Sequence, residues 1–238
     1  MKTVSLVGDC HSTRVWEYWN PEDCPVDFKV WGFAGMTAWL FDPKKFEIEQ
    51  TQSSGVENWN VYCNDKPAEY WIKPFSQFKD SDIVMLWIGY VDIRLFMPKY
   101  KPLLHNSKKV IIEFLDRAKD YYKESKILLI EPLPQFTEMH LKYEGISPSY
   151  TYEERQKINK LFVETLNEYV IEHNMLPPIT QNDIKDAIGF QEFTTECVHS
   201  VAEHPQDSLK PEYWAKIYNL FIEKAVLTLE SLYGKDKE

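Results

Sequence analysis

The stretch of the chain that most constrains its fold is residues 82–88, a run of seven in which every residue after Asp82 is apolar. A strand that is apolar on both faces has to be covered on both faces, as the central strands of parallel sheets are. The shorter runs 2–7 and 126–130 have the same character. The sequence therefore predicts at least three buried parallel strands, each followed by residues that can cover the sheet.

Amphipathic segments lie between and after these runs. One helix is predicted to begin at Asn106 or Ser107, a second to follow the capping box Thr151-x-x-Glu154, and a third to carry Pro211 in its first turn. The predicted apolar positions of these helices are Val110, Ile111, Phe114, Leu115, Ala118 and Tyr122; Ile158, Leu161, Phe162, Thr165, Leu166 and Tyr169; and Trp214, Ile217, Leu220 and Phe221. Shorter helices are expected at 11–19 and 36–41, a second strand at 28–31 and a weak strand near 175–179.

Strands that alternate with helices predict a parallel sheet covered on both faces. We therefore expect an α/β fold, a three-layer α/β/α sandwich of the flavodoxin-like type. Residues 1–234 would form a single domain with an irregular insertion at about 46–78, and residues 235–238 would form a tail.

Composition limits the function classes. The chain of 238 residues has a formal net charge of −10, which argues against a surface for nucleic acid or anionic membranes. It contains no apolar run of about eighteen residues and no recognisable signal peptide, which predicts a cytoplasmic protein without a membrane partner. The four cysteines are widely spaced, which favours free thiols over disulfides or a structural zinc site.

The first predicted strand runs directly into Gly8-Asp9-Cys10. A glycine turn at the end of a parallel strand places the next side chains at the carboxyl edge of the sheet, where ligands bind in open α/β folds. Cys10 is therefore a candidate nucleophile, which requires a base, an orienting carboxylate and an oxyanion site from elsewhere in the chain.

Three later segments can supply these groups, and with the first they resemble the four motif blocks of the SGNH (GDSL-type) hydrolases. Gly8-Asp9-Cys10 resembles the block Gly-Asp-Ser, Gly35-Met36-Thr37-Ala38 the second block, Gly89-Tyr90-Val91-Asp92 the block Gly-x-Asn-Asp, and Glu196-x-x-His199 the block Asp-x-x-His. The order of the blocks agrees with the family, and the resemblance spans nearly the whole chain.

The resemblance implies a hydrolase of a small acyl ester, possible substrates being esters on carbohydrates, that works through an acyl-enzyme and without a cofactor or metal. Cys10 would be the nucleophile, His199 the base and Glu196 its orienting carboxylate, with a backbone N–H of Gly35 in the oxyanion hole. The remaining oxyanion and substrate-binding candidates are Asp9, His11, Gly89, Asp92 and Arg94.

Three positions depart from the family pattern. Cys10 replaces a serine, Glu196 replaces an aspartate, and Val91 replaces the asparagine whose side chain stabilises the oxyanion. The Gly-x-x-Asp-x-Arg form resembles a divergent branch with Gly-Asp-Ser-His and Gly-Glu-Ile-Asp-x-Arg motifs, in which Arg94 or His11 would take the place of the missing donor.

Other functions remain open at this point. A protein that has lost activity and binds a ligand through the same cleft would carry the same three substitutions. The pair Asp9-x-His11 also resembles the first block of metal-dependent phosphoesterases, although the Gly-Asn-His block of those enzymes is absent. His204 competes with His199 for the role of base, and Trp16, Trp19, Trp31 and Trp59 could line a sugar cleft or pack in the core. The oligomeric state and the acyl group are not predicted.

Overall fold

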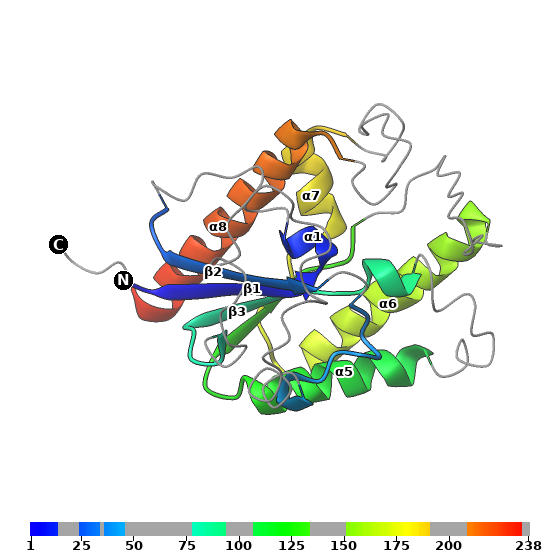
Figure 1. Cartoon of the computed structure of the whole chain (residues 1–238), viewed down its shortest axis with the longest axis horizontal. Helices are drawn as coiled ribbons and strands as arrows, with labels where there is room; N and C mark the ends of the chain where they lie inside the picture. The colour runs from blue at the N-terminus through cyan, green and yellow to red at the C-terminus, as the bar shows by residue number, and fades with distance from the viewer. Residues whose placement is uncertain are drawn as a thin grey trace, which may run out of the picture.

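The computed structural model describes residues 1–13, 24–33, 36–45, 78–93, 107–133, 151–190 and 209–234. Four strands of this part form one parallel sheet in the order β2-β1-β3-β4, with bounds β1 Thr3–Asp9, β2 Asp27–Phe33, β3 Ile83–Trp87 and β4 Lys126–Leu129. Figure 1 shows helices on both sides of this sheet, α7 and α8 on one side and α5 and α6 on the other. The predicted three-layer α/β/α architecture is confirmed.

Strand β1 lies inside the sheet, where it pairs with β2 on one side and β3 on the other. The chain first turns from β1 to β2 and then continues on the opposite side of β1 with β3 and β4. The carboxyl ends of β1 and β3 thus flank the point at which the direction of winding reverses. In doubly wound sheets this is the usual place for a ligand.

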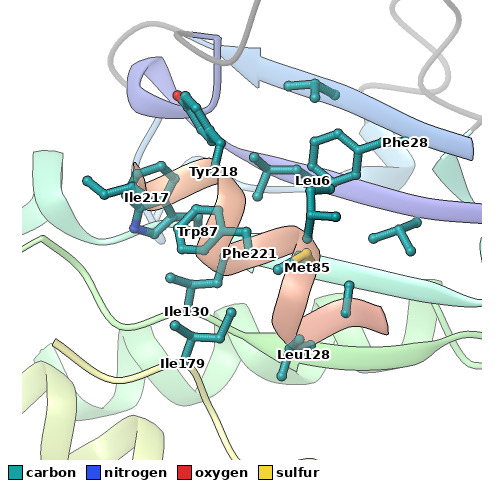
Figure 2. Close-up of a cluster of buried hydrophobic side chains, with 14 of the residues drawn as sticks. Leu6, Phe28, Met85, Trp87, Leu128, Ile130, Ile179, Ile217, Tyr218 and Phe221 are labelled. Atoms are coloured by element: carbon teal, nitrogen blue, oxygen red, sulfur yellow. The ribbon is translucent and has the colours of Figure 1, made fainter. Parts of the chain in front are cut away.

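Side chains of the strands alternate between the two faces and enter two separate cores. On β3, Ile83, Met85 and Trp87 belong to the core beneath α8, whereas Val84 and Leu86 belong to the core beneath α5 and α6. Figure 2 shows the first of these cores, in which Trp87 of β3 packs among Tyr218 and Phe221 of α8. This double burial explains why the sequence of β3 is apolar at every position.

The long helices follow the predicted apolar patterns. They are α5 Ser107–Tyr121, α6 Tyr152–Glu172 and α8 Pro211–Tyr233, and Thr151 and Glu154 form the expected reciprocal capping box of α6. The helix α7, Gln181–Ile188, was not predicted, although Thr180 and Asp183 form a capping box there and Gly189 ends the helix at φ +83°. A second capping box in the sequence could have revealed it.

Some of the shorter predicted elements differ in the structure. Residues 36–41 do not form a helix but contain a hydrogen-bonded turn, because the N–H groups of Leu40 and Phe41 both donate to the Thr37 carbonyl. The predicted strand at 175–179 is reduced to one bridge between Ile179 and Ile130. The helix predicted at 11–19 begins one residue earlier as α1, Cys10–Thr13, and residues 14–19 lie outside the described residues. Of the predicted insertion, only Phe78 is described, and the tail lies outside the described part.

Candidate active site

The β1–α1 turn, residues 8–13, stands at the carboxyl end of the sheet (Figure 1). Asp9 is the last residue of β1 and Cys10 the first of α1. Only glycine fits at position 8, because a Cβ atom there would lie 2.3 Å from the carbonyl oxygen of Trp87 and 2.2 Å from Ser12 Oγ. The close approach of β1, β3 and α1 at Gly8 fixes where the chain leaves the sheet, and so fixes the backbone at Cys10.

Asp9 is buried and binds the residue two positions ahead of it. Its Oδ1 atom accepts a hydrogen bond from the backbone N–H of His11 at 3.0 Å and lies 2.9 Å from His11 Nδ1. A carboxylate oxygen accepts, so Nδ1 is the donor in this pair. The two bonds close a ring around the Cys10 peptide, which is a local turn typical of aspartate.

Three aromatic rings surround the imidazole of His11, which is 3% exposed. Its centroid lies 4.5 Å from that of Tyr90, which meets it edge-on, 5.5 Å from the stacked ring of Trp214, and 5.7 Å from Trp87. The hydroxyl of Tyr218 donates to the His11 carbonyl oxygen at 2.6 Å. The β1–α1 turn is therefore held both by β3 and by the last helix.

Asp92 connects the end of β3 to the segment that follows Gly35. Both of its carboxylate oxygens accept from the backbone N–H of Ala38, at 3.0 and 2.9 Å. Burial and, in addition, the negative charge of Asp9 raise the pKa of Asp92 from 3.8 to about 7, although the hydrogen bond from the Ala38 N–H acts in the opposite direction. Asp9 and Asp92 are thus close enough to influence one another electrostatically.

The turn that carries Ala38 is tied down from a second side. Arg117 of α5 donates from Nε to the carbonyl oxygen of Phe41 and from Nη2 to that of Ala38, both at 2.9 Å. Trp39 and Leu40 at the tip of the turn are 59% and 52% exposed. The turn is therefore fixed in place although its apolar tip faces outward.

Gly89 lies two residues after the end of β3 in a conformation that other residues rarely adopt, with φ +129°. A Cβ atom there would lie 2.6 Å from Phe162 Cζ and 2.7 Å from Pro132 Cγ. The glycine of the third block thus lets the chain after β3 pass beneath α6 and the end of β4. Val91, at the asparagine position of that block, is buried.

The other predicted site residues cannot be placed relative to this turn. Gly35, Arg94, Glu196, His199 and the competing base His204 lie outside the described residues, as do Trp16, Trp19 and Trp59, while for Cys10 only the backbone is described. Trp31 is buried in the core beneath α5 and α6. Among the predicted site residues that the structure describes, Asp9 binds His11 and its charge acts on Asp92.

Two contributions to this site were missed by reasoning from the sequence. Trp214 and Tyr218 lie one turn apart on the buried face of α8, and one stacks on His11 while the other binds its carbonyl oxygen. Only Trp214 was identified, and as a core residue. The backbone N–H of Ala38 has no sequence signal of its own. The sequence offers one indication of the contacts of His11, namely the aromatic residues Trp214 and Tyr218 on the predicted buried face of the last helix.

Polar side chains near the end of β4 form hydrogen bonds with one another. Glu131 accepts from the Gln181 backbone N–H at 2.7 Å and from Asn167 Nδ2 at 3.0 Å, and Gln181 and Asn159 exchange side-chain hydrogen bonds. These bonds join α6 and α7 to the sheet. They brace the fold at the same edge as the β1–α1 turn.

In the described part of the chain, no three His, Cys, Asp or Glu side chains are grouped so that they could hold a metal ion. None of the described helices is long and apolar enough to cross a membrane.

This chain matches known proteins in its fold but not in its sequence. No protein-family model matches the sequence. No curated protein matches it either. Solved structures do match: an extracellular lipase from Streptomyces rimosus has a TM-score of 0.54 at 11% identity, covering 94% of this chain and 99% of its own. This match extends over nearly the full length of both proteins.

The chain has the fold of the SGNH hydrolases. A candidate acylhydrolase from Bacteroides fragilis matches with a TM-score of 0.52 at 15% identity over 96% of this chain and 88% of that one. A candidate arylesterase from Agrobacterium tumefaciens matches at 0.50 and 14% identity, over 95% and 99%. At such low identity the SGNH fold is what these proteins share with this chain. The chemistry has to be argued from the residues.

Proposed function

We propose that this protein is an SGNH-type hydrolase that cleaves a small acyl ester, an esterase or carbohydrate deacetylase, with Cys10 as the nucleophile. The observation that carries the proposal is the position of Cys10. It follows β1 directly, at the reversal point of a sheet whose fold is shared with a lipase and with candidate esterases and acylhydrolases. The hydrogen bond between Asp92 and Ala38 supports it, since it joins the third motif block to the second.

In the proposed reaction, the Cys10 sulfur attacks the acyl carbon while His199 accepts the thiol proton and Glu196 orients the imidazole. The backbone N–H groups of Cys10 and Gly35 would stabilise the oxyanion. Collapse of the intermediate expels the alcohol, which takes the proton from His199, and leaves a thioester on Cys10. Water then attacks the thioester with His199 as base, which releases the acid and restores the thiol. Arg94 would provide a further contact to the substrate.

The experiment compares hydrolysis of p-nitrophenyl acetate and of an acetyl thioester by the wild type, Cys10→Ala and Cys10→Ser. Cys24→Ser is the matched control, because Cys24 is a half-buried free cysteine at the start of the segment leading into β2. We expect Cys10→Ala to lose at least a hundredfold in kcat while Cys24→Ser keeps it. Equal kcat in the wild type and Cys10→Ala would refute the assignment of the nucleophile.

A second candidate function is a binding protein that uses the same cleft without turnover. The observation in its favour is Val91, since an apolar, buried side chain stands where the family has an oxyanion donor. Absence of hydrolysis by both the wild type and Cys10→Ser, together with saturable binding of an acetylated sugar, would support this function over the first.

A further inference from the structure

We propose that Asp9 and His11 are positioning residues for Cys10: the hydrogen bond between the Asp9 carboxylate and His11 Nδ1 fixes the peptide on which the nucleophile stands. The inference rests on the proposed role of Cys10 and goes beyond it. It assigns to Asp9 and His11 a role different from the substrate contact that the motif blocks suggest.

Burial favours positioning over substrate contact. Asp9 is 1% exposed and His11 is 3% exposed, so neither offers a free surface to a ligand. A buried carboxylate is expensive unless hydrogen bonds compensate for its lost hydration. Within the described part of the chain, Asp9 accepts two such bonds, and both come from His11. His11 therefore compensates the lost hydration of the Asp9 carboxylate within the β1–α1 turn, and Cys10 is the residue between the two in the chain.

The imidazole in turn is fixed by elements far away in the sequence. Trp87 and Tyr90 contact it from β3 and the residues after β3, and Trp214 stacks on it from α8. The hydroxyl of Tyr218 holds its carbonyl oxygen. Because His11 cannot move without disturbing two layers, its bond to Asp9 transmits the rigidity of the sheet and of α8 to the Cys10 peptide.

The same carboxylate also lies near the oxyanion segment. The charge of Asp9 acts on Asp92, whose own carboxylate binds the Ala38 N–H three residues after Gly35. Asp9 therefore precedes the proposed nucleophile directly in the chain and acts electrostatically on the carboxylate that binds the Ala38 segment. An attacking group held within a few tenths of an ångström of its productive position is worth orders of magnitude in rate.

Two matched variants separate the hydrogen bond from the packing of the ring. His11→Asn retains an N–H donor bonded to Cγ, as Nδ1 is, but lacks the aromatic ring. His11→Phe retains a ring of similar size but has no donor. If the bond to Asp9 positions Cys10, His11→Asn keeps most of the kcat and His11→Phe loses about tenfold to a hundredfold, with KM unchanged in both. A packing role predicts the reverse order.

A second measurement does not depend on hydrolysis. Hydrogen exchange of the peptide spanning residues 8–13 reports how rigid the turn is. We expect exchange about tenfold faster in His11→Phe than in His11→Asn. Ile111→Val is the control, because Ile111 of α5 is buried in the other core, beneath α5 and α6. It should lower stability without accelerating exchange at residues 8–13 beyond the global change.

If His11→Phe does not fold, Asp9→Asn and Asp9→Ala provide the same comparison, since both remove the charge but only asparagine retains an acceptor. The inference is overturned if the variant that lacks the hydrogen bond (His11→Phe or Asp9→Ala) exchanges as slowly at residues 8–13 as the matched variant that keeps it (His11→Asn or Asp9→Asn). It is also overturned if the variant that lacks the bond has an equal or higher kcat. If no variant and no wild type hydrolyses an ester, the proposed function fails. The exchange measurement then still decides whether the pair fixes the turn.

Discussion

Replacement of Asp92 by asparagine tests the electrostatics of the site. In the folded protein, burial first and the charge of Asp9 in addition raise the pKa of Asp92 to about 7, against 3.8 for an ordinary aspartate. Between about pH 4 and pH 7 the folded state therefore holds a proton that the unfolded state releases. Stability then falls as pH rises through this window, and the ionised carboxylate destabilises the folded protein fully above about pH 7.

The size of the effect follows from the two pKa values. Each pKa unit corresponds to about 1.36 kcal/mol, so the wild type loses on the order of 4 kcal/mol between pH 4 and pH 8 through this group. Asp92→Asn cannot ionise, but it keeps one oxygen that can accept from Ala38 N–H. Any cost of burying the amide NH₂ is independent of pH. The difference in free energy of unfolding between variant and wild type should therefore rise by about 4 kcal/mol across this range, in favour of the variant.

The assay is urea unfolding followed by tryptophan fluorescence at pH values from 4 to 8. Asp82→Asn is the matched control. Burial would raise the pKa of Asp82, but the Thr3 backbone N–H and Lys2 Nζ bind its carboxylate and lower the pKa overall. Its stabilising contribution is present above about pH 4 and lost only in more acidic solution, so its difference should be flat from pH 5 to 8. A flat profile for Asp92→Asn as well would refute the reasoning.

Three further predictions concern the surroundings of the site. Gly89→Ala should destabilise the protein by about 3 kcal/mol or prevent folding, because it combines a left-handed φ with a clash at Phe162, and a thermal melt would measure this. Ser12→Ala should leave stability unchanged or raise it by up to about 1 kcal/mol in urea unfolding, since Ser12 Oγ is buried without a hydrogen-bond partner among the described residues. Lys224→Met should cost about 1 kcal/mol or less at low salt and less at high salt, because it removes a half-exposed ion pair with Asp183 between α7 and α8; equal losses at both salt concentrations would contradict an electrostatic origin.

Elements with a long periodic pattern were predictable from the sequence. Strand β3 is apolar throughout because both of its faces are buried. The start of α6 is predictable because Thr151 and Glu154 form a capping box. The error at 36–41 has a different cause. Hydrogen bonds from Arg117 to the carbonyl oxygens of Ala38 and Phe41 satisfy groups that a helix would have used, and Arg117 lies in α5, far along the chain. Local sequence carries no record of such a distant partner.

For the candidate site, too, the sequence predicts residues but not the contacts between them. Motif spacing predicted Asp9, Gly89 and Asp92 as site residues, because strand ends of a parallel sheet meet at one edge. It did not reveal that Asp9 binds His11, since the choice of partner depends on Trp87 and Trp214 enclosing the imidazole. Residue types can be assigned to a site from order and spacing, but the hydrogen bonds among them depend on tertiary packing.

The bond from Tyr218 to the His11 carbonyl has a consequence for the synthesis of this protein. Its two partners are 207 positions apart in the sequence. At roughly 5 to 20 residues per second, the ribosome needs on the order of 10 to 40 seconds to make that stretch. During this interval Trp87 and His11 lack the helix that covers them. The nascent chain therefore exposes Trp87 and His11 until α8 is available to cover them, and chaperone binding should end only after α8 has packed onto the sheet.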